Sequence, residues 1–184
     1  RVSGFSISPL ALNLFKNLVA LLFFAATFLA MGIPFWQAID RRSLALMAVS
    51  GIIGIAVGDT LFFASLNRLG AGLSAIVDCL YSPMVILFSF FLLRERLSPS
   101  DLLGAAMVVS AVLLTSAKPA EEGITRRDLA LGVIYGALSM AAMALGVVIL
   151  KPLLSGGAPV IWITAARLAF GGAPLLLILW WGRL

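Results

Sequence analysis

The chain has 184 residues, of which 62% are hydrophobic and only 11% are charged, and its net charge is +5 at pH 7. A soluble domain has about 45–50% apolar and about 25% charged residues, so this composition excludes an ordinary soluble fold and indicates an integral membrane protein. The basic residues lie mostly in short loops between apolar runs, which is typical of membrane proteins. We therefore expect a lipid environment and no nucleic-acid partner.

Six apolar runs approach or exceed the roughly 20 residues that cross the hydrocarbon core of a bilayer. No run alternates between apolar and polar residues as a strand does, so we predict an all-α bundle with six transmembrane helices. In chain order the predicted helices cover residues 10–35, 44–66, 73–93, 102–117, 129–150 and 160–181.

Local patterns support several helix starts and contacts. Ser98 and Asp101 are spaced as a capping box, as are Thr125 and Asp128, and Ser8 precedes a proline at a helix start. Two glycine pairs have the GxxxG spacing that allows helices to pack closely, which makes each pair a candidate packing site. The glycine pairs are Gly54 with Gly58 and Gly132 with Gly136.

An internal repeat is suggested by two helix starts. Each has a small residue and a proline, followed about two turns later by a single cation, Lys16 in one case and Arg167 in the other. Four predicted helices lie between the two, so the repeat unit has five helices. Because five is odd, the second copy has inverted topology, a common plan of secondary transporters. We therefore expect a ten-helix (5+5) protein of which this chain is an internal part.

The stretch 58–114 carries a more specific pattern. An Ala/Gly-rich turn follows a short aromatic stretch, Pro83 lies in mid-helix, Glu95 follows that helix, and the next helix opens with Leu102, Leu103 and Gly104. This order and spacing resemble the EamA domain of the drug/metabolite transporter superfamily. Asp78 lies outside the family pattern. The resemblance implies two inverted repeats, transport of small metabolites, and a central cavity lined by the helices at 10–35, 73–93 and 160–181.

On this resemblance, residues 1–118 contain helices two to five of a first EamA repeat, 119–127 form the inter-repeat loop, and 128–184 begin the second repeat. The first helix of the first repeat and the last three of the second would lie outside the chain. We expect a multi-pass protein of a bacterial or archaeal plasma membrane.

Two carboxylates lie inside apolar runs, where charge is costly and indicates function by default. Asp59 and Asp78 flank a predicted turn at 67–72, and the helical rise puts both about 10–15 Å below it. Lys16 lies about 10 Å from the same face by the same rise. We therefore expect Lys16, Asp59 and Asp78 to share one layer, with Arg167 at a similar depth from the opposite face.

Two interpretations of this layer remain open. In one, a carboxylate pairs with Lys16 while the other is free for substrate, proton or sodium. In the other, an ion pair locks the bundle, and for Asp59 alone this structural role is favoured. Polar side chains at helical spacing on 73–93 also predict a cavity wall, with a kink near Pro83. The candidate substrate-binding or coupling residues are Asn13, Lys16, Asp59, Asp78, Tyr81, Ser82 and Arg167.

The favoured function is a secondary transporter that moves an amino acid, amine, organic acid or drug-like metabolite by alternating access, and a homodimer is conceivable. The alternatives are a structural or sensor bundle and, less favoured, a membrane-embedded enzyme. The chain has no histidine, no HExxH, no Gly-x-Ser-x-Gly elbow and no P-loop, so we expect no enzyme activity, metal or cofactor. Met140 and Met143 are candidates for an adaptable cavity lining, although core filling is their favoured role.

Overall fold

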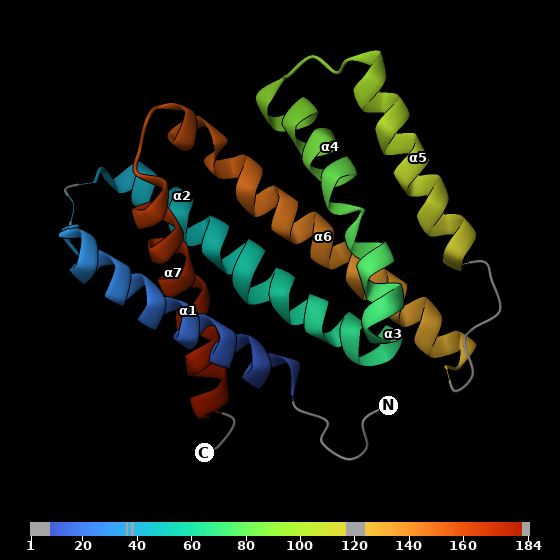
Figure 1. Ribbon diagram of the computed structural model, residues 1–184, viewed down its shortest axis with the longest axis horizontal. Helices are drawn as coiled ribbons and strands as arrows, with labels where there is room; N and C mark the ends of the chain where they lie inside the picture. The colour runs from blue at the N-terminus through green and yellow to red at the C-terminus, as the bar shows by residue number, and fades with distance from the viewer. Residues whose placement is uncertain (1–7, 36, 38, 117–123, 182–184) are drawn as a thin grey trace.

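The computed structural model describes residues 8–35, 37, 39–116 and 124–181. The predicted loop 119–127 and the ends of the two expected repeats fall partly outside these residues. All regular structure in the described part is helical, and it forms a bundle (Figure 1). The elements are α1 (Pro9–Met31), α2 (Arg41–Gly51), the π-helix η1 (Ile52–Asp59), α3 (Thr60–Asp78), α4 (Tyr81–Leu93), α5 (Pro99–Ser116), α6 (Arg126–Ser155) and α7 (Val160–Trp181).

The prediction of an all-α membrane bundle is confirmed. Four helical segments are long and apolar enough to cross a membrane, namely Pro9–Met31, Arg41–Asp78, Arg126–Ser155 and Val160–Trp181, and two apolar helices are shorter. The long segment Arg41–Asp78 contains a reversal at Gly70, whose φ of 74° and ψ of 175° are not helical. A residue with a Cβ is strained at such a positive φ, so glycine suits this turn. The predicted turn at 67–72 is therefore present.

The helix that follows the turn at Gly70 is interrupted where the sequence predicted one helix over 73–93. The helix ends at Asp78 and α4 begins at Tyr81. At the interruption the amides of Cys79 and Leu80 donate to carbonyls three residues back, at 3.2 and 3.0 Å. Pro83 lies in the first turn of α4 and has no N–H for the Cys79 carbonyl. The break therefore falls within one turn of the proline.

The helix α6 lies in the middle of the bundle (Figure 1). It packs against the arm formed by α2, η1 and α3 and against α4, while α7 packs on α1, α2 and η1, and α5 lies outside beside α4. One buried apolar cluster joins the arm, α5 and α6, and contains Leu69, Val77, Leu80, Val112 and Met140. A second cluster joins α2, α6 and α7, and contains Met47, Leu150 and Ile163.

Buried serine hydroxyls connect the arm to α6 at three levels, and we call this contact the Ser–Gly seam. The donor–acceptor distances are 2.5 Å for Ser50 to the Gly146 carbonyl, 2.8 Å for Ser139 to Gly58, and 2.8 Å for Ser65 to Gly132. On α6 the three positions are seven residues apart, whereas on the arm the first two are eight apart and the next seven. The wider turns of η1 take up the additional residue and keep the seam in register.

The glycines of both predicted GxxxG pairs lie at close helix contacts, so their packing role is confirmed. A Cβ on Gly132 would lie 2.5 Å from Leu69 Cγ, and one on Gly136 would lie 2.5 Å from Val77 Cγ1. A Cβ on Gly54 would lie 3.6 Å from the Gly146 Cα across the seam. The absence of side chains at these positions lets the backbones approach.

The capping predictions are confirmed at two helix starts and wrong at one. Ser98 and Asp101 cap α5 reciprocally: the Asp101 amide donates to Ser98 Oγ at 3.1 Å, and the Ser98 amide donates to Asp101 Oδ2 at 2.9 Å. Thr125 Oγ1 accepts from the Asp128 amide at 3.0 Å. Ser8 precedes Pro9 at the start of α1 as predicted, but the Ser8 hydroxyl makes no cap bond to that helix. Asp40 caps α2, and hydrogen bonding to Ser43 lowers the pKa of Asp40.

Candidate functional site

Two adjoining pockets lie between α1, the arm, α4, α6 and α7. The larger, of about 380 Å³, is the Asp78 pocket, and the smaller, of about 270 Å³, is the Arg167 pocket. Both are lined by Lys16, Asp59, Tyr81 and Met143. The Asp78 pocket adds Phe62, Phe63, Asp78 and Met140. The Arg167 pocket adds Gly54, Ile55, Val147, Thr164, Arg167 and Leu168.

An ion pair stands where the two pockets meet. Lys16 Nζ on α1 binds Asp59 Oδ2 at the end of η1. The Asp59 side chain is only 8% exposed, whereas that of Lys16 is 44% exposed. A buried carboxylate is costly unless it is paired, so Lys16 is what allows a charge at position 59. Since both residues line both pockets, a molecule in either pocket would meet both charges.

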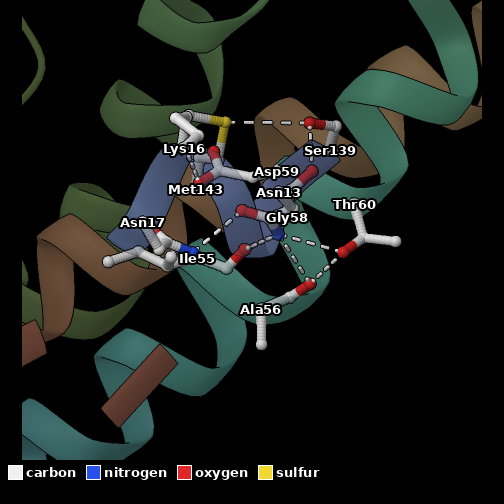
Figure 2. A network of polar contacts seen from close by, with 10 residues as sticks. All are labelled: Asn13, Lys16, Asn17, Ile55, Ala56, Gly58, Asp59, Thr60, Ser139 and Met143. Carbon is white, nitrogen blue, oxygen red and sulfur yellow. Dashed lines mark hydrogen bonds and ion pairs between the residues drawn. The ribbon is translucent and has the colours of Figure 1, made fainter. Parts of the chain in front are cut away.

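The π-helix that ends at Asp59 is held by an amide on α1. Asn13 Nδ2 donates to the Ile55 carbonyl at 2.8 Å and to Thr60 Oγ1 at 3.0 Å, and it lies 3.4 Å from the Ala56 carbonyl. Asn17 Nδ2 donates to Asn13 Oδ1 at 3.0 Å (Figure 2). This network gives partners to backbone groups of η1, where the ordinary α-helical ladder is altered. Because Asn13 bonds to residues before and after Asp59, it holds the backbone from which the Asp59 side chain extends.

Arg167 on α7 lies in the same pocket as Lys16 and Asp59. Its Nε is buried without a hydrogen-bond partner in the part of the chain that the structure describes. The sequence predicted that Arg167 lies about as deep as Lys16 but is reached from the opposite face of the membrane. In the structure, α1 and α7 bring the two cations to one pocket. The Arg167 pocket therefore has a cation that the described residues leave without a counter-charge bond.

Asp78 is a carboxylate of the Asp78 pocket, as Arg167 is a cation of the Arg167 pocket. It is half-buried in the last turn of α3, and no salt bridge among the described residues involves it. Tyr81 opens α4 and lines both pockets. The helix break between Asp78 and Tyr81 lets both side chains border the same space.

Two other candidate residues lie elsewhere. Asn13 is fully buried and lines neither pocket, because its amide is engaged with the arm. Ser82 is exposed and also lines neither pocket. The sequence placed Ser82 on the Asp78 face by assuming one continuous helix, and the break at residues 79–80 changes the rotation of α4 relative to that helix.

Sequence reasoning missed the aromatic wall of Phe62 and Phe63 and the π-helix. Lys16 Nζ lies 6.0 Å from the centroid of the Phe63 ring, which suits a cation–π contact. The one available signal for η1 was a difference in spacing between two helices. Ser50 and Gly58 are eight residues apart, whereas their partners on α6, Gly146 and Ser139, are seven apart. Glu95 forms an exposed ion pair with Lys151, with 2.6 Å between Oε1 and Nζ, and neither residue lines a pocket.

Metal binding has no support in the described residues, among which no group of three or more His, Cys, Asp or Glu side chains could hold an ion. The site instead consists of two cations and two carboxylates around apolar and aromatic walls. Such a site can bind a small polar molecule by charge and exclude water from its apolar part.

The fold and the site define a class, a multi-pass helical membrane protein with charged groups around internal pockets. The comparison with known families is more specific. The pattern of the EamA-like transporter family matches residues 1–117, more than half of the chain, and the chain belongs to this family. No curated protein and no solved structure matches it. The protein is thus a multi-pass membrane transporter of the drug/metabolite type.

Proposed function

We propose that the protein is a secondary transporter that moves small metabolites by alternating access, and that the two pockets form its substrate site. The observation that carries this proposal is the distribution of charge. Lys16 and Asp59 satisfy each other at the junction, while Asp78 and Arg167 lie on the two sides without an ion-pair partner among the described residues. A substrate is the natural partner for such groups, because unpaired charge within a membrane is costly.

A free carboxylate on one side and a free guanidinium on the other suit a substrate with both charges, such as an amino acid. Arg167 would bind the substrate carboxylate by its planar fork, and Asp78 would bind the ammonium group. Proton or sodium coupling through Asp59 or Asp78 belongs to the same proposal. So does the arrangement of residues 1–118 as most of one inverted repeat and 128–184 as the start of the second.

Transport by the intact protein tests this proposal. The protein is reconstituted in proteoliposomes, and uptake of radiolabelled L-alanine is measured under an imposed proton or sodium gradient, followed by other amino acids, amines and organic acids. We expect gradient-driven uptake that Arg167→Ala lowers by at least about tenfold, since a hydrogen-bonded charge contributes about 1.5–3 kcal/mol. Glu95→Gln is the control, because its exposed ion pair lies outside both pockets.

Failure of every substrate in this panel would contradict the proposal. The Lys16–Asp59 ion pair favours one other class, a bundle in which the charges only hold helices together. In that case Lys16→Ala and Asp78→Asn would leave any uptake by the folded fraction unchanged. A turnover that persists in detergent, without compartments, would instead point to an enzyme.

A further inference from the structure

Met143 occupies the junction of the two pockets. It is one of four residues that line both, and the other three are Lys16, Asp59 and Tyr81. Those three have polar or charged groups, and two of them are bonded to each other. Met143 is therefore the one wholly apolar side chain at the junction, and a methionine side chain has several rotatable bonds that allow it to move.

The other side of Met143 is closed by the arm. A Cβ on Gly58 would lie 2.7 Å from Met143 Cγ, closer than real Cβ contacts. Ser139, one turn before Met143 on α6, donates to the Gly58 carbonyl at 2.8 Å, and its Oγ lies 3.7 Å from Met143 Sδ (Figure 2). Met143 thus rests directly against the glycine at position 58, and any side chain there would push it toward the pockets.

We infer that Met143 determines the substrate specificity of the transport site by dividing the space between Asp78 and Arg167. This inference rests on the proposed function. With Met143 in place, a short substrate fits beside the ion pair, and a long side chain competes with the methionine. Shortening residue 143 joins the two pockets, and a larger residue at 58 narrows the junction from behind.

The test compares one short and one long probe, L-alanine and L-phenylalanine, in proteoliposomes that contain the intact protein. Met143→Ala is expected to raise the ratio of phenylalanine to alanine uptake about tenfold, because a change of one or more methylene groups in an apolar pocket alters selectivity by about 10–200-fold. Gly58→Ala is expected to lower the ratio. The double variant Gly58→Ala with Met143→Ala is expected to restore the ratio of phenylalanine to alanine uptake that Gly58→Ala lowers, since the next contacts of a Cβ at position 58 lie at 3.4 Å.

Two matched variants control for the loss of a methionine. Met107→Ala changes an exposed methionine on α5 and is expected to leave the ratio unchanged. Met140→Ala enlarges only the Asp78 pocket and is expected to change the ratio less than Met143→Ala. An equal effect of Met140→Ala and Met143→Ala would overturn the junction role, and so would an unchanged ratio in Met143→Ala.

Thermal unfolding of the same variants separates the two proposals. Gly58→Ala is expected to lower the melting temperature in the wild-type background, and by less when Met143 is already alanine. If the wild-type protein carries neither probe, the proposed function fails for these substrates, and this melting cycle alone decides whether Met143 fills the space beside Gly58. If both probes are carried and the ratio never changes, transport stands and the inference is overturned.

Discussion

The Ser–Gly seam and the pocket layer use polar groups in opposite ways, although they share the same helical arm. In the seam, Ser50, Ser65 and Ser139 are buried and each donates to a backbone carbonyl of the facing helix. In the pocket layer, only Lys16 and Asp59 are paired, and Arg167 Nε has no partner among the described residues. The difference separates groups that hold the bundle together from groups that, on the proposed function, would bind a substrate.

The π-helix η1 joins the two regions. On one side it carries Gly58 into the seam, and on the other it presents Asp59 to the pockets. Its extra residue keeps the seam in register while Asn13 holds its carbonyls from α1. Changes in the seam should therefore act mainly on stability, and changes in the layer should act mainly on transport, with the Lys16–Asp59 pair affecting both.

The largest loss of stability is expected for Lys16→Ala. This change leaves Asp59 buried without its cation, and breaking a buried pair costs about 3–5 kcal/mol. Since the Lys16 side chain is 44% exposed, the protein encloses the pair only in part, and we expect the low end, about 3 kcal/mol. Denaturant unfolding in detergent measures the change. Adding Asp59→Asn should restore most of the loss, and a stable Lys16→Ala variant without that change would contradict the pairing.

Asn13→Ala should lower the free energy of unfolding by about 2 kcal/mol, because carbonyls of η1 lose their donor while remaining buried. The same variant should also reduce uptake, since Asp59 is no longer held in its direction. Thr27→Ala on the same helix is the control, because the Thr27 hydroxyl bonds only to its own helix at Phe23. Loss of uptake without any loss of stability would instead assign Asn13 to substrate contact.

Gly136→Ala tests the helix packing beside the seam. The new methyl group would lie 2.5 Å from Val77 Cγ1 and 3.0 Å from Ser65 Oγ, and such overpacking costs about 1–3 kcal/mol. Gly104→Ala is the matched control, because nothing lies within 4 Å of its new methyl group and alanine favours a helix. For the folded fraction of Gly136→Ala, the KM for substrate should equal that of the wild type. A changed KM would show that the seam and the pockets are not separate.

The smallest effect is expected at the start of α6. Thr125→Ala removes the hydroxyl that accepts from the Asp128 amide, and loss of an N-cap costs about 1 kcal/mol. Thr125→Ser retains the hydroxyl and should behave as the wild type. A melting temperature equal in both variants would show that the cap contributes nothing measurable.

Much of the fold could be predicted from the sequence, because membrane spans depend on local apolarity and local caps. The turn at Gly70 and the boxes at Ser98 and Thr125 are of this kind. The common depth of Lys16, Asp59 and Asp78 followed from helical rise alone, and the structure brings these side chains to one pocket. These features depend on position along a helix and need no knowledge of its neighbours.

The rest depends on tertiary contacts. The π-helix accompanies contacts of the arm with α6 and with Asn13. The residue types within η1 do not indicate a π-helix by themselves. The break at Cys79 and Leu80 changes the rotation of α4, so the helical spacing that put Ser82 beside Asp78 did not hold. The meeting of Arg167 with Lys16 depends on the packing of α7 on α1. Helical periodicity cannot show such relations between helices.

The most direct test of the account is the KM of Asp78→Asn for L-alanine, measured in proteoliposomes together with the free energy of unfolding of the same variant. The account predicts a KM at least about tenfold higher than that of the wild type, since a charged hydrogen bond to the substrate is lost. It also predicts an unchanged free energy of unfolding, because Asp78 has no salt bridge in the described part of the chain. An unchanged KM with lowered stability would place Asp78 among the groups that hold the bundle and contradict the account.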